Sequence, residues 1–149
     1  MFTVYRTPSP IESSIVTASR TIGRVGDDAL TRLHRICSAL PEVSERPSHG
    51  APTWFIRGRK AFVTLWRDGH HQRRFPHLWC AAPLGTQEEL VAAAPARFFR
   101  PPYVGNRGWV GVRLDGRVDW DEVAELCHDA YRTVAPARLV AILDGRDTC

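Results

Sequence analysis

Arginine and aromatic side chains that could bind a polyanion gather in the middle of the sequence. Arg100, Tyr103, Arg107 and Trp109 surround a stretch rich in Pro and Gly that leads into a segment typical of a β-strand. Guanidinium groups neutralise phosphates and flat rings stack on bases, so this pattern indicates a nucleic-acid-binding surface. Further cations stand at two expected turns and in the last expected strand: Arg57, Arg59, Lys60, Arg73, Arg74 and Arg113. Ordinary solvated charges on a sheet would give a similar pattern and remain the alternative.

The charge of the chain is unevenly distributed. The 149 residues carry a net charge of +4. Residues 53–117 hold eleven basic and four acidic side chains, net +7, whereas residues 118–149 hold three basic and seven acidic ones, net −4. A basic middle segment favours a polyanionic partner on one side of the molecule.

Motifs for catalysis, cofactors and metals are missing from the sequence. Neither a GxSxG nucleophile turn nor a Gly-rich phosphate loop occurs. His49 could act as a base, but a structural histidine at a turn is the simpler interpretation. His70, His71, His77 and Cys80 are of metal-binding types, yet adjacent histidines on a strand point to opposite faces. We therefore predict a protein that is not an enzyme and holds no cofactor or metal.

The cysteine pattern and the hydropathy indicate a cytoplasmic protein. Cys37, Cys80, Cys127 and Cys149 form no CxxC pair, so reduced, buried thiols are expected. No run of about 18 apolar residues predicts a membrane span, and the first residues lack the apolar core of a signal peptide.

The helices that must position these side chains are marked by caps and apolar stripes. Residues 1–26 lack an apolar period and are expected to be a flexible extension of a single domain, residues 27–149. Asp27 or Asp28 should cap a helix that ends at Pro41. Thr86 and Asp119 should each begin a further helix as the first residue of a capping box. The second of these helices should end near residue 136, with a short helix over 137–143 after it.

The strands are predicted from β-branched and aromatic content. Residues 42–52 form a polar connector, and strands are expected near 53–56, 61–66, 77–82, 97–100 and 109–114. The order α-β-β-β-α-β-β-α predicts an α+β fold, a two-layer α/β sandwich with a mainly antiparallel five-stranded sheet and helices on one face. Alternation along the last strand places Val110, Val112 and Leu114 toward the core and Trp109 and Arg113 on the open face.

Several segments resemble the MmcQ/YjbR family. They are residues 39–45, 48–52, 78–83 and, above all, Phe98–Asp115 followed by Val118–Val123. The resemblance spans about residues 29–143 and implies a fold similar to secretion-chaperone-like folds. Members of the family are described as DNA-binding proteins with a double-wing arrangement of β-hairpins. The second hairpin region, residues 68–77, is longer in this sequence than in the family.

Two functions follow from these patterns. The first is a non-catalytic DNA-binding protein of the MmcQ/YjbR type that contacts phosphates through basic β-hairpins. The alternative is a protein-interaction or chaperone-like module without a nucleic-acid role. In that case the acidic helix and the basic sheet could also pair head to tail in a homodimer.

Overall fold

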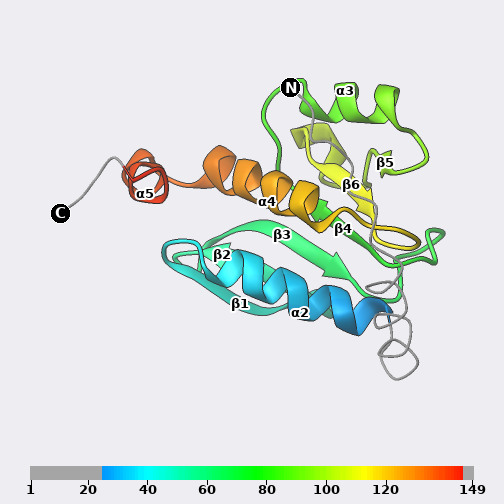
Figure 1. Cartoon of the computed structure of the whole chain (residues 1–149), viewed down its shortest axis with the longest axis horizontal. Coiled ribbons are helices and arrows are strands. Elements are labelled where there is room, and N and C mark those ends of the chain that lie inside the picture. Colours follow the sequence, from blue (N-terminus) through cyan, green and yellow to red (C-terminus); the bar gives the residue numbers. More distant parts are fainter. Residues whose placement is uncertain (1–24, 146–149) are drawn as a thin grey trace, which may run out of the picture.

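The computed structural model describes residues 25–145. Residues 1–24 of the expected N-terminal extension lie outside the described residues, as does Cys149. The remaining residues form a two-layer arrangement in which two long helices pack against one face of a sheet (Figure 1).

The sheet has six strands rather than the expected five. They are β1 (Val43–Ser48), β2 (Ala51–Ile56), β3 (Lys60–Trp66), β4 (His77–Cys80), β5 (Phe98–Phe99) and β6 (Val110–Arg113). Their spatial order is β1-β2-β3-β4-β6-β5, and every neighbouring pair is antiparallel. The fold class is therefore α+β with an open antiparallel sheet.

The additional strand, β1, lies where we expected a polar connector. It pairs with β2 in an antiparallel hairpin from Val43 opposite Ile56 to Ser48 opposite Ala51. Its middle residues are exposed, because β1 is the outer strand and has a neighbour on one side only. A solvent-exposed edge strand needs no apolar alternation and tolerates Pro47, so the usual signals of a strand are missing here.

The helices are α2 (Val25–Ser38), α3 (Thr86–Ala93), α4 (Trp120–Val134) and α5 (Ala137–Leu143). Helix α2 contacts β1 and β2, and α4 contacts β3 and β4, so the two helices lie side by side on one face of the sheet (Figure 1). Helix α3 instead lies beside β5 at the far edge of the sheet. From β2 to α5, the order of strands and α-helices along the chain is the order predicted from the sequence.

One of the three predicted helix caps is confirmed and two are wrong. The Asp119 carboxylate accepts hydrogen bonds from the backbone N–H groups of Asp121 and Glu122, at 3.1 and 3.3 Å, and begins α4. In helix α3 the N-cap is Gly85, and Thr86 is the first residue of the helix. No side chain caps this helix. Helix α2 already begins at Val25, so both candidate caps, Asp27 and Asp28, lie inside its first turns.

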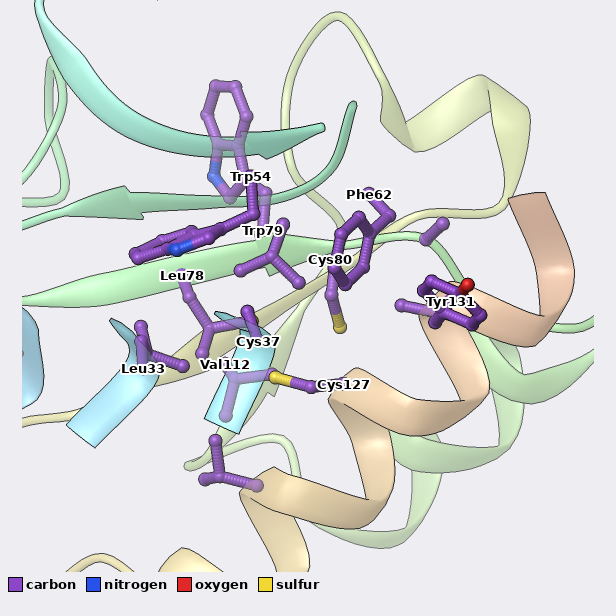
Figure 2. Close-up of a cluster of buried hydrophobic side chains, with 14 of the residues drawn as sticks. Leu33, Cys37, Trp54, Phe62, Leu78, Trp79, Cys80, Val112, Cys127 and Tyr131 are labelled. Carbon is purple, nitrogen blue, oxygen red and sulfur yellow. The ribbon is translucent and has the colours of Figure 1, made fainter. Parts of the chain in front are cut away.

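The core lies between the helices and the sheet. Figure 2 shows side chains from α2 (Leu33 and Cys37) and from α4 (Cys127) close to those of the central strands. Tyr131 of α4 packs edge-on against Phe62, with ring centroids 5.7 Å apart. Its hydroxyl donates to the carbonyl of Pro41 at 2.7 Å and so ties the end of α4 to the chain after α2.

The described cysteines are free and buried in this core, as expected. Burial raises the pKa of the Cys37 and Cys80 thiols well above the ordinary value, with the neighbouring Cys127 adding to the effect. A thiol that stays protonated is a poor nucleophile, so these groups act as small packing residues.

Candidate nucleic-acid interface

The sheet face opposite α2 and α4, here called the open face, is unusually rich in aromatic side chains. In β2 the side chains of Trp54 and Ile56 belong to the core under the helices, so the alternate residues, Thr53 and Phe55, point to the open face. The same alternation in the other strands adds further rings to this face: Trp66, His77, Trp79, Phe99 and Trp109.

One half of the open face is hollowed into a groove of about 640 Å³. Four rings line it, contributed by β2, β3, β4 and the residue before β6: Phe55, Trp66, Trp79 and Trp109. These rings are largely covered, since no more than 7% of Phe55, Trp79 or Trp109 is exposed. Ser48 and His49 of the β1–β2 turn lie at one part of its edge, and Arg59, Lys60 and Arg107 supply the cations around it. This surface, called the groove below, joins residues that lie far apart in the sequence.

Arg107 reaches the groove from a short 3₁₀ helix, η1 (Gly105–Arg107), in the connection between β5 and β6. Its guanidinium lies over the Trp109 ring, 5.5 Å from the centroid, in a cation–π contact. Trp109 is on the open face as predicted, but only 5% of it is exposed, so it does not project as a stacking platform. The folded-back connection covers most of the ring, which the local pattern could not indicate.

Gln87 of α3 holds this connection in place. It is 3% exposed, and its Nε2 donates to the carbonyl oxygens of Gly105, at 2.8 Å, and Trp109. Its Oε1 accepts from Arg100 at 3.3 Å. The position of Arg107 beside Trp109 thus depends on a buried amide from another element, and Arg100 supports the loop rather than projecting freely.

The β2–β3 turn supplies the cations on the other side of the groove. Arg59 and Lys60 are exposed, and no acidic side chain of the described residues pairs with them or with Arg107. Arg57 differs, because its Nε donates to Glu42 at 3.0 Å and its charge is thereby compensated. Of the three basic residues predicted at this turn, two remain available to a ligand.

The other half of the open face is closed by the long β3–β4 connection, residues 67–76. His70 packs on Trp66 and Trp79, with centroid distances of 4.2 and 5.1 Å. Phe75 lies against the rings of His77 and Phe99 at 5.4 and 6.1 Å. The connection expected to project as a hairpin therefore folds back onto the sheet and covers it.

The arginines at this closed end lie flat on aromatic rings. Arg113 lies 3.9 Å from the centroid of Phe75, and Arg73 lies 4.2 Å from that of Phe99. Arg113 also makes two hydrogen bonds to Asp115, at 3.0 and 2.6 Å, and these hold the pKa of the Asp115 carboxyl below its ordinary value. Arg74, by contrast, is exposed to solvent.

The histidines of this region serve packing. Burial is the main reason why the pKa of His77 falls to about 4, and its Nδ1–H donates to the Phe75 carbonyl at 2.8 Å. The ring is therefore neutral near pH 7. The prediction that His70 and His71 point to opposite faces is wrong: their centroids are 3.9 Å apart, because they lie in a loop and His71 has a positive φ of 53°.

Tyr103, another predicted site residue, is 74% exposed. Its hydroxyl lies 3.4 Å from Nε2 of His71. Among the described residues, no group of three or more His, Cys, Asp or Glu side chains is arranged to bind a metal ion. No helix within residues 25–145 has the length and apolar character to cross a membrane.

Several residues of the open face were not singled out from the sequence. Arg46 of β1 lies 3.7 Å from the Phe55 centroid and donates to the Gly58 carbonyl at 3.1 Å. Phe55 and Trp79 were missed as groove residues because alternation was applied to the last strand only. Five of the six residues of Ala51–Ile56 are apolar, a signal that both faces of β2 are largely buried.

These features define a class of protein: a small α+β domain with an antiparallel sheet, helices on one face and a cation-edged groove on the other. The chain belongs to the YjbR family, whose family model matches residues 38–133. The resemblance predicted from the sequence is thereby confirmed.

A solved structure supports the fold. The chain is similar to the crystal structure of Deinococcus radiodurans protein DR2400, described there as containing a DUF419 domain, with a TM-score of 0.58 and 20% sequence identity. The similarity covers 71% of this chain and 78% of that chain. At this identity it supports the shared fold and carries no statement about function. The comparison with curated proteins gave no match.

Proposed function

We propose that the protein binds DNA, without catalysing a reaction, and that it does so by contacting phosphates through the cations around the groove. The observation that carries this proposal is the position of Arg59, Lys60 and Arg107 around one groove, without acidic partners among the described residues. An unpaired cation beside a concave surface is available to neutralise a phosphate and release its counterions.

The geometry refines the interface expected from the sequence. Arg57 and Arg113 are compensated by Glu42 and Asp115, and Arg73 lies on a ring, so these residues contribute less to phosphate binding than the cations of the groove. Arg74 and Tyr103 remain exposed at the covered end of the open face and would extend the contact. Within residues 25–145 the long helices α2 and α4 lie on the opposite face of the sheet, so the proposal includes no base-specific readout by a helix.

Salt-dependent fluorescence anisotropy with labelled DNA tests the proposal. Binding should weaken steeply between about 50 and 200 mM salt, as expected for several phosphate contacts. The double variant Arg59→Gln and Arg107→Gln should bind more weakly, and its salt dependence should be less steep by about two phosphate contacts.

A matched double variant controls for the change in net charge. Arg117→Gln with Arg138→Gln removes the same charge from exposed positions outside the groove. This control should keep both the affinity and the salt dependence of the unmodified protein. If neither single-stranded nor duplex DNA binds at low salt, the proposal fails. A protein partner or self-association is then the hypothesis to test. Equal losses in the two double variants would assign binding to net charge rather than to the groove.

A further inference from the structure

We infer that the β3–β4 connection opens in acid: it packs on the open face while its own histidines and His77 are neutral, and it moves away from the sheet when they take up protons. Trp66 and Trp79 lie under His70 of this connection and also line the groove. Opening would therefore widen the groove at this end. The inference concerns the protein alone and does not depend on the proposed DNA binding.

Contacts between uncharged rings hold the connection closed. The His70 ring packs on Trp66 and Trp79. Phe75 of the connection packs against the His77 ring, and the Phe75 carbonyl accepts the Nδ1–H of His77 at 2.8 Å. His77 itself is fully buried. A charged imidazole in these positions would lose its water, so the closed connection favours the neutral form of both rings.

The two histidines of the connection also touch each other. The ring centroids of His70 and His71 are 3.9 Å apart, and the ring that faces both of them is Tyr103. Burial, with the neighbouring His71 as a second cause, lowers the pKa of His70. The indoles under His70 can attract one positive charge, but they do not relieve the repulsion between two. Both rings can be charged together only when the connection is open and the rings separate.

His77 responds most strongly to the same change. Burial is the largest cause of the fall in its pKa from 6.5 to about 4, and its backbone hydrogen bond opposes that fall. His70 and Arg73 of the connection and Arg113 of β6 lower the pKa further by their charge. The nearby carboxylate, Asp115, is held by the guanidinium of Arg113. Because an open connection returns His77 to water, opening becomes more favourable as the pH falls from 6.5 toward about 4.

Two backbone amides of the connection can report its opening. The His70 N–H donates to the Arg73 carbonyl at 2.9 Å, and the Arg73 N–H donates to the His70 carbonyl at 3.0 Å. A hairpin of this size is not stable alone in water, so these two hydrogen bonds depend on the sheet beneath them. Both amides should therefore exchange with solvent when the connection opens.

Hydrogen exchange of the unmodified full chain, followed by NMR at about pH 7 and about pH 5, tests the inference. Protection factors remove the effect of pH on the intrinsic exchange rate. A return of His77 to its ordinary pKa on opening shifts the equilibrium roughly twentyfold toward the open form between these two pH values. The protection of the His70 and Arg73 amides should fall by at least that factor. Amides in the middle of α4 should stay more strongly protected at both pH values.

The double variant His70→Phe and His77→Asn adds a site-specific test. Phe keeps a ring on the two indoles and the Asn amide keeps a donor for the Phe75 carbonyl, but neither side chain titrates. In this variant the fall in protection should disappear. His49→Asn with His128→Gln is the matched control, because it removes two histidines outside the connection. The control should show the same fall as the unmodified protein.

Three results would overturn the inference. The first is equal protection of the connection amides at both pH values. The second is protection of these amides equal to that of α4 at the lower pH, because opening would then require unfolding of the whole domain. The third is an undiminished fall in a folded double variant. A melting curve verifies that the double variant is folded, and if it is not, the comparison of the connection with α4 in the unmodified protein decides.

Discussion

Gln87 should contribute several kilocalories per mole to stability, because its amide is the buried link between α3 and the β5–β6 connection. Replacement by Leu keeps the volume and removes the amide. The Gly105 carbonyl would still accept the Gly108 N–H at 3.0 Å, whereas the Trp109 carbonyl would lose the hydrogen bond that Gln87 donates to it. One lost hydrogen bond at about 1 kcal/mol and one orphaned carbonyl at about 1–3 kcal/mol give a cost of about 2–4 kcal/mol.

Urea unfolding followed by tryptophan fluorescence measures this cost. With a denaturant slope of about 2 kcal/mol/M, a loss of about 3 kcal/mol lowers the midpoint by about 1.5 M. Glu89→Ala is the control on the same helix: Glu89 is exposed, so the free energy of unfolding should change by less than about 0.5 kcal/mol.

Gln87→Glu gives the same link a pH dependence with a defined sign. A carboxylate cannot donate to the two carbonyls, whereas a protonated carboxyl can donate to one of them, so the pKa of the new side chain should be raised in the folded state. The variant should therefore lie closest to the unmodified protein below the ordinary Glu pKa of about 4.3 and lose stability, relative to it, as the pH rises. An unchanged midpoint in Gln87→Leu, or a deficit of Gln87→Glu that does not vary with pH, would refute this account of the connection.

Two further predictions concern packing and capping. Gly111→Ala should lower the free energy of unfolding by about 1–3 kcal/mol, because its Cβ would overlap the Phe99 ring across the β5–β6 pair; adding Phe99→Leu should restore part of the loss, and no loss in the single variant would contradict the packing. Asp119→Ala should cost about 1 kcal/mol through the lost cap of α4, whereas Thr86→Ala should cost much less because its side chain caps nothing. Thermal unfolding of both capping variants checks this difference, and equal losses would mean that Thr86 does cap α3.

Local signals in the sequence identified the elements that bury one face. Helix α4 has an Asp119 cap and an apolar stripe, both of which act within a few residues, so its start and its buried face could be predicted. The alternation of Val110, Val112 and Leu114 in the last strand held for the same reason. Strand β1 was not predicted, because an exposed edge strand has no alternation of apolar and polar residues.

The candidate site depended on contacts between residues distant in sequence. The sequence by itself determined the antiparallel α+β class, the family, and the supply of arginines and aromatic rings. Only the tertiary structure decided that Arg57 is compensated by Glu42, that Gln87 fixes the loop over Trp109, and that the β3–β4 connection covers half of the open face. The physical reason is range: caps and periodicity act over one turn or one strand, whereas charge pairing and burial depend on which segments the packed sheet brings together.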